Sequence, residues 1–185
     1  MSVELQMEIL EAFASNDQEY MSLNGISKTI GKAYPQVHAK AKEMISLSIL
    51  NSISIGRSIA CTPNMNNPTT IMLLSLSASI KATGYYDNNP EALSFTKELL
   101  NAMGNDNATI LYYDNRIIIL TDLEQKRIIE SYAAEILTKM KRMNKIVKSI
   151  ECHNYSHSIS LKGHSDSYII LHGYESFYRS WGWRN

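Results

Sequence analysis

Residues 31–40 read GKAYPQVHAK, and this stretch decides the fold prediction for the first part of the chain. Proline breaks a helix in its interior, but at the first helical position it lacks only an N–H that would be unpaired anyway. Pro35 is therefore predicted to begin a helix that runs to about residue 50, and the four residues before it form a turn. Val37, Ala41 and Met44 recur at helical spacing and predict its buried face.

Two further helices are predicted before this turn. Residues 3–16, VELQMEILEAFASN, place apolar side chains at helical spacing, with glutamates on the opposite face. Residues 22–31, SLNGISKTIG, begin with Ser22 as a candidate N-cap and end with Gly31 as a stop signal.

After residue 50 the periodicity changes from helical to alternating. Ile53 and Ile55 alternate with serines, and Gly56-Arg57 then separates them from a second alternating stretch that Pro63 ends. A two-residue loop with glycine first predicts a tight hairpin. Three helices followed by a hairpin are the order of a winged helix-turn-helix, so we expect that fold for residues 1–67.

Residues 68–185 are expected to form a small α+β domain, which makes the fold class α+β as a whole. Periodicity does not decide between helix and strand for the apolar segment 71–80. In the long helix of this half, Ile128 and Tyr132 are expected among the core residues. The other predicted elements are a helix at 90–103, a hairpin at 109–122 turning at Asp114-Asn115, the long helix from about 123 to 148, a strand at about 167–172 and a short aromatic helix after Gly173.

The composition is that of a globular protein, with 44% apolar and 19% charged residues in a chain of 185. The net charge is zero, so the charge balance by itself indicates no nucleic-acid partner. Cys61 and Cys152 lie far apart and predict no disulfide framework. No signal peptide or membrane-spanning run is recognisable, and we expect a cytoplasmic protein without a membrane partner.

Residues 22–68 resemble the winged-helix domain of a group of small archaeal transcriptional regulators. That group shows the pattern Lxx(I/L)(A/S)xx(I/L)GxxY, then a basic recognition helix, a short wing ending in GRS, a strand and an Asn-Pro-containing exit. The matching residues are Leu23, Ile26, Ser27, Ile30, Gly31, Tyr34, Gly56, Arg57, Ser58 and Asn64. The resemblance implies a DNA-binding transcriptional regulator, and we expect a homodimer on a pseudo-palindromic site of double-stranded DNA.

The second half is similar to the partner domain of some of these regulators, a minimal nucleotidyltransferase that ends in the pattern hxLxGxxxFY. Residues 170–178, ILHGYESFY, resemble this ending. The catalytic signature of that family is a Gly-Ser after one strand and two Asp residues spaced by one on the next, and residues 109–122 contain neither. The resemblance therefore implies a dimerisation or effector domain, without catalysis and without a cofactor.

The expected DNA contacts lie on the helix that Pro35 begins, on the turn and helix before it, and on the hairpin. Lysine, arginine and glutamine side chains contact phosphates or base edges, and a helix N-terminus favours phosphate. The contacts are Ser27, Lys28, Lys32, Tyr34, Gln36, His38, Lys40, Lys42, Arg57 and Ser58. Residues 1–67 carry five basic and six acidic side chains, but the acids cluster on the first helix and leave room for a positive face.

Other candidate sites have simpler interpretations. A histidine-rich run matches no compact zinc spacing, and we expect no metal site there; its members are Cys152, His153, His157, His164 and His172. Asp114 and Asp122 suit a turn and a helix N-cap. The aromatic tail could form a ligand cage, but we expect core or dimer packing; it comprises Tyr168, Tyr174, Phe177, Tyr178, Trp181 and Trp183.

Two alternatives to a DNA-binding regulator stay open. One is a nucleotidyltransferase-like enzyme or pseudoenzyme with an appended winged helix, which would bind nucleotide and magnesium near Asp114 and Asp122. The other is a protein-interaction module, which a neutral or acidic surface over residues 36–42 would favour. The sequence does not specify the operator, the sign of regulation or whether a small-molecule effector binds.

Overall fold

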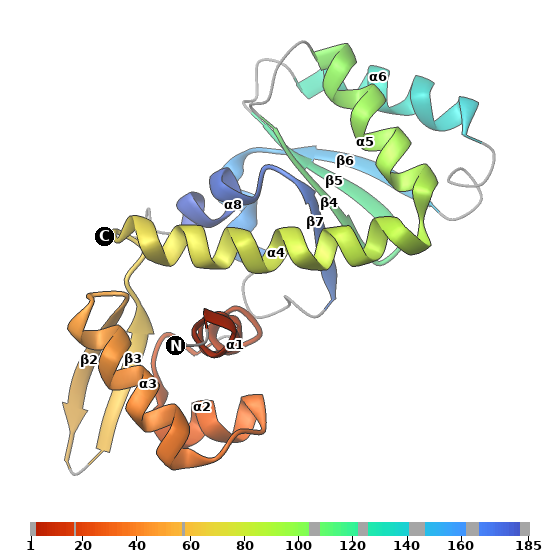
Figure 1. Ribbon diagram of the computed structural model, residues 1–185. Helices are drawn as coiled ribbons and strands as arrows, with labels where there is room; N and C mark the ends of the chain where they lie inside the picture. Colours follow the sequence, from red (N-terminus) through yellow and green to blue (C-terminus); the bar gives the residue numbers. More distant parts are fainter. Residues whose placement is uncertain are drawn as a thin grey trace.

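The chain folds into an α+β protein with two separate sheets, which confirms the predicted fold class (Figure 1). The computed structural model describes residues 3–16, 18–56, 58–103, 108–121, 126–140, 147–161 and 167–181. The first part, red to orange in Figure 1, lies below a long central helix, and the second sheet lies above it. None of the described helices is long and apolar enough to cross a membrane.

Local capping signals set the elements of the first part. The hydroxyl of Ser22 accepts a hydrogen bond from the Gly25 amide at 3.0 Å and begins the second helix, which Gly31 ends at a φ of 66°. The third helix begins at Tyr34, one residue before Pro35. The elements are α1 (Val3–Ala14), β1 (Met21–Ser22), α2 (Leu23–Ile30), α3 (Tyr34–Ser46), β2 (Leu50–Ile55) and β3 (Ser58–Pro63).

The first sheet has three antiparallel strands in the order β1-β3-β2. Ile55 pairs with Ser58, so the hairpin has the two-residue loop that was predicted. Cys61 is fully buried on the face toward the helices, whereas Ile53 and Ile55 are exposed. The distal part of the hairpin therefore projects into solvent (Figure 1).

The undecided segment 71–80 lies within α4 (Pro68–Asn88), the long central helix. Asn67 is its N-cap and accepts a hydrogen bond from the Thr69 amide at 2.8 Å. The Asn67 Nδ2 group also donates to the carbonyl oxygens of Leu47 and Ser48, at 3.0 and 2.9 Å. The expected boundary after residue 67 thus coincides with the beginning of a helix whose N-cap is hydrogen-bonded to the two residues that follow α3.

The second sheet has the strand order β6-β5-β4-β7 and one parallel pair, β5 with β6. Its elements are α5 (Pro90–Met103), β4 (Thr109–Tyr113), β5 (Arg116–Leu120), α6 (Lys126–Lys139), β6 (Ser149–His153), the 3-10 helix η2 (Tyr155–Leu161), β7 (Tyr168–His172) and α8 (Tyr174–Trp181). Asp114 and Asn115 form the predicted turn, both with positive φ (47° and 60°).

Alternate residues of the strands contribute to two cores. Leu111 and Ile118 belong to the core that includes α1, α3, α4 and α8, while Ile110 and Ile117 belong to the core with α5 and α6. Because the first core also contains Leu10 of α1, it runs without interruption from the first part of the chain into the second sheet.

The predicted long helix was wrong in its length and in part of its core. The helix ends at Lys139, and residues 149–153 form β6, a strand that had not been predicted. A parallel strand beside β5 requires a crossover, which α6 provides, so the chain must leave the helix and return. Ile128, at 57% exposure, and Tyr132 lie on the outer face of α6. The start of the predicted helix, residues 123–125, lies outside the described residues.

Candidate nucleic-acid interface

The turn between α2 and α3 is held by internal hydrogen bonds. The Ser27 hydroxyl donates to the Lys32 carbonyl oxygen at 2.7 Å, and the Ser27 side chain is buried. Ser27, one of the expected DNA contacts, therefore fixes the turn from inside. Gly31 supplies the left-handed conformation that lets the chain reverse toward α3.

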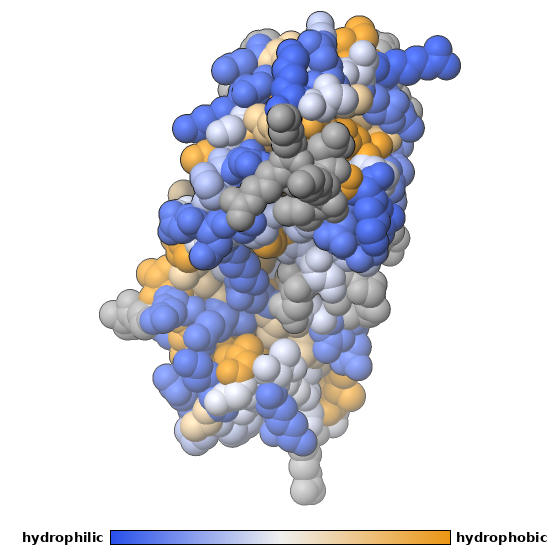
Figure 2. Space-filling view, turned by 90° about the vertical axis from the view of Figure 1, so that its right-hand side faces the viewer, coloured by the Kyte–Doolittle hydropathy of each residue, from blue (hydrophilic) through white to orange (hydrophobic). Residues whose placement is uncertain are grey.

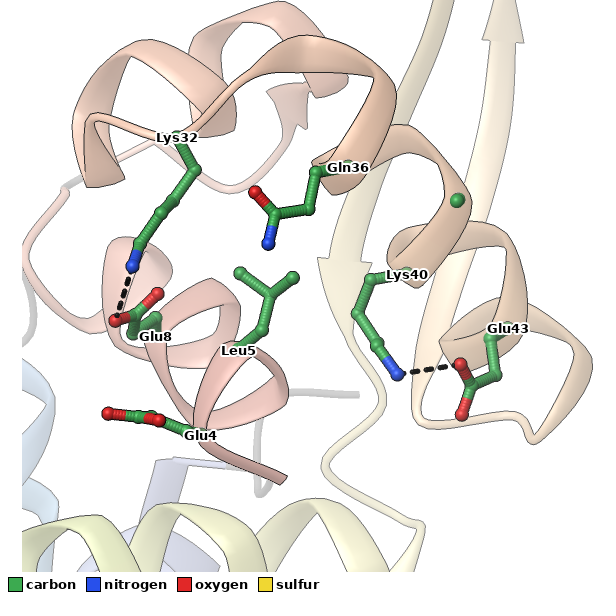
Figure 3. Close-up of a pocket in the computed structure, with 8 residues that line it drawn as sticks. Glu4, Leu5, Glu8, Lys32, Gln36, Lys40 and Glu43 are labelled. Atoms are coloured by element: carbon green, nitrogen blue, oxygen red, sulfur yellow. Dashed lines mark hydrogen bonds and ion pairs between the residues drawn. The ribbon is translucent and has the colours of Figure 1, made fainter. Parts of the chain in front are cut away.

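A groove of about 480 Å³ separates α1 from α3, and three expected DNA contacts line it (Figure 3). Lys32 Nζ lies 3.3 Å from Glu8 Oε1, and Lys40 Nζ lies 2.7 Å from Glu43 Oε2. Gln36 lies between these two pairs, above Leu5. The lining residues are Glu4, Leu5, Glu8, Lys32, Gln36, Ala39, Lys40 and Glu43.

The charges in this groove nearly cancel, with three carboxylates against two ammonium groups. The Lys40 side chain is only 11% exposed and is held by Glu43 one turn away. Glu8 Oε2 is buried without a hydrogen-bond partner among the described residues. The expected separation of the acids of α1 from the lysines is therefore not present, because α1 brings Glu4 and Glu8 against α3. Nothing in a single-helix pattern indicates this contact.

The outward face of α3 has a different character. Pro35, Ala39 and Lys42 are exposed along it, opposite the buried Val37, Ala41 and Met44, and Ala39 also borders the groove. Tyr34 and His38 lie at one side of this face, and their ring centroids are 5.6 Å apart. A helix that presents small side chains and one cation outward can approach a partner closely.

Two of the expected contacts are cations that have no counter-ion within the described part of the chain. Lys28 on α2 and Lys42 on α3 are exposed, and neither forms an ion pair with a described acidic residue. Ser58 is exposed at the start of β3, and Arg57 at the hairpin tip lies outside the described residues. The expected contacts thus fall into an inward group (Ser27, Lys32, Gln36, Lys40) and an outward group (Lys28, Tyr34, Lys42, Ser58), with His38 half-buried between them.

The histidine run of the second half forms a pair of stacked rings. The ring centroids of His153 and His157 are 3.9 Å apart, and His153 Nε2 lies 3.3 Å from Glu151 Oε2. Partial burial and the neighbouring His153 hold the pKa of His157 below its ordinary value. Within the described ranges, no three His, Cys, Asp or Glu side chains are arranged to hold a metal ion. His164 and Asp122 lie outside those ranges.

Packing accounts for the described aromatic residues of the tail. Tyr168, Phe177 and Tyr178 are buried, and the ring centroids of Phe177 and Tyr178 are 5.3 Å apart in an edge-to-face contact. The prediction of core packing is confirmed for these three residues, and Trp183 lies outside the described part. On the face shown in Figure 2, hydrophilic side chains predominate and hydrophobic ones form small separate patches.

Comparison with known proteins identifies no relative of this chain: no family model, curated protein or solved structure matches it significantly. A function for this chain is therefore inferred from the arrangement of its own residues.

Proposed function

We propose that the chain is a DNA-binding transcriptional regulator that acts as a homodimer, with residues 1–67 as a winged helix-turn-helix. The order α1-β1-α2-α3-β2-β3, with β1 and β2 on either side of β3, supports this proposal. In that fold the second helix of the helix-turn-helix enters the major groove and the hairpin contacts the adjacent backbone. α3 and the β2–β3 hairpin would have these two roles.

The outward face of α3 is the observation that carries the proposal. The small side chains of Pro35 and Ala39 project little from the helix, so base edges can come close to it. An alanine methyl can also contact a thymine methyl. Lys28 and Lys42, which have no described counter-ion, would bind phosphates on either side. Lys32 and Lys40 would contribute less to affinity, because Glu8 and Glu43 already neutralise them.

A salt titration tests the proposal directly. The affinity for a fluorescent duplex of mixed sequence is measured by anisotropy between about 50 and 200 mM salt, where each phosphate contact contributes roughly 0.9 to the log–log slope. The double variant Lys28→Ala/Lys42→Ala should reduce the magnitude of the slope by nearly the contribution of two phosphate contacts. Lys97→Ala, an exposed lysine on α5, is the matched control and should bind like wild type.

Two outcomes would overturn this proposal. One is the absence of binding at the lowest salt concentration. The other is an equal loss of affinity in the Lys97→Ala control, which would indicate nonspecific attraction by overall charge.

A protein-interaction module is the second candidate, and the groove between α1 and α3 favours it. The groove is nearly neutral with an excess of carboxylate, and the Leu5 side chain contributes to its lining. Such a groove suits a peptide segment with basic and apolar side chains better than a phosphate backbone. If the chain binds no DNA, Glu4→Ala and Glu8→Ala become the informative variants for partner binding.

A further inference from the structure

One face of α4 carries large apolar side chains in contact with solvent. Met72, Leu76 and Ile80 are 69%, 46% and 55% exposed. They recur every four residues, so they form one continuous ridge along the middle of the helix. We call these three residues the α4 stripe.

The opposite face of α4 is already buried. Ile71, Leu74 and Ala78 belong to the core that α4 shares with α1, α8 and the second sheet. A surface helix normally has one apolar face, and a helix that is apolar on both faces is normally covered on both. In the view of Figure 1, α4 runs across the front of α8 and β7, and no described element covers its front.

The residues of α4 that lie beside the stripe are uncharged. Between Pro68 and Thr83 the only charged residue is Lys81, and its Nζ lies 3.0 Å from Glu11 Oε1 on α1, away from the stripe. The exposed neighbours Thr69 and Thr83 are neutral. Along α4, a second copy of the same surface can therefore approach without bringing like charges together.

We propose that the α4 stripe is the contact between two copies of this chain, which pair antiparallel about a twofold axis at Leu76. Leu76 then meets the partner's Leu76, and Met72 meets the partner's Ile80. Ridges of residues spaced by four pack against each other at a crossing angle of about 50°. This inference deepens the homodimer part of the proposed function by naming its surface.

The orientation fits a dimer on one duplex. In Figure 1 the first part of the chain lies below α4 and the second sheet above it. A twofold axis directed from the second sheet toward the first part reverses α4 and keeps both first parts on the same side. Two α3 helices on the same side are what successive major grooves require.

The oligomeric state of single variants tests the surface without DNA. By sedimentation equilibrium, wild type should reach twice its monomer mass of 20.9 kDa at micromolar concentration. Leu76→Glu should raise the dimer dissociation constant at least about tenfold, because it places two carboxylates against each other. Ile128→Glu is the matched control, at an isoleucine on α6 that is 57% exposed, and should remain dimeric. A monomeric wild type, a dimeric Leu76→Glu or a monomeric Ile128→Glu would each overturn the proposal.

Disulfide trapping tests the antiparallel register. Cys61 and Cys152 are buried, and burial raises the pKa of both thiols, so the native cysteines should react slowly. Under mild oxidation, Leu76→Cys should cross-link to itself, and Met72→Cys should cross-link to Ile80→Cys when the two variants are mixed. Self-cross-linking of Met72→Cys alone would overturn the antiparallel arrangement. Because no DNA is present, failure here is distinguishable from failure to bind DNA.

Discussion

Lys40 and Glu43 form an ion pair within α3, with 2.7 Å between Nζ and Oε2. The pair lies at the edge of the groove between α1 and α3, next to the outward face of the helix (Figure 3). The Lys40 ammonium group, which would otherwise attract phosphate, is therefore already paired with a carboxylate.

Replacing Glu43 with glutamine should strengthen DNA binding. The change removes one repulsive carboxylate and releases the Lys40 ammonium, so we expect affinity at low salt to rise about two- to fivefold. The measurement is the anisotropy titration described above, and Glu98→Gln on α5 is the control. An unchanged affinity for Glu43→Gln would place DNA away from this side of α3.

Asn67→Ala should destabilise the fold by about 1–3 kcal/mol. The side chain caps α4 and also donates to the Leu47 and Ser48 carbonyl oxygens, so one substitution removes a helix cap and two further hydrogen bonds. Urea unfolding measures the change. Asn66 is exposed, so the free energy of unfolding of Asn66→Ala should stay within about 0.5 kcal/mol of wild type. Equal losses of stability in the two variants would contradict this role for Asn67.

Two glycine substitutions should change stability in opposite directions. A Cβ at Gly173 would lie 2.6 Å from the Ala108 carbonyl oxygen at a φ of +77°, so Gly173→Ala should cost at least about 2 kcal/mol. A Cβ at Gly84, inside α4, would meet nothing within 4 Å. Gly84→Ala should therefore gain roughly 0.5–1 kcal/mol from helix propensity. A thermal unfolding series on both variants checks the two signs, and a neutral Gly173→Ala would be inconsistent with the contact at Ala108.

Stability should fall as the pH decreases through about 6.5, the ordinary value for histidine. Partial burial, and then the neighbouring His153, lower the pKa of His157, so the unfolded chain takes up a proton before the folded one does. The loss begins near the unfolded pKa and is complete below the folded one. Urea unfolding at pH 7.5 and 5.5 should show a smaller drop for His157→Gln than for wild type. An identical drop would assign the effect to other groups.

Local chemistry is what the sequence predicts best. Ser22 and Gly31 limit α2 as expected, and Asp114-Asn115 forms the expected turn, because each of these signals acts within a few residues. β6 was missed because its hydrogen-bonding partner, β5, lies about thirty residues earlier in the chain. The strand's own pattern, SIECH, is too short and too polar to predict a sheet position.

The charge of the groove at the candidate site could not be predicted for the same reason, because it depends on residues far apart in the chain. Helical spacing correctly places Val37, Ala41 and Met44 on the buried face of α3, and Gln36 and Lys40 line the groove instead. Spacing along one helix does not say which neighbour lies beside these residues, and the neighbour is the acidic helix α1. Predicting the charge state of this surface required the packing of two helices that are separated by about twenty residues.

The position of α4 has a mechanical consequence. From Pro68 to Asn88 this helix passes from the first part to the second sheet without a break, and its inner face packs into a core common to both. Among the described residues 58–103, no linker without regular structure separates the first part from α4 beyond the short turn before Pro68, so we expect the first part and the second sheet to move together. In the proposed dimer, a small molecule bound near the second sheet would therefore alter the spacing of the two α3 helices by rotating whole copies about their contact, rather than by bending either one.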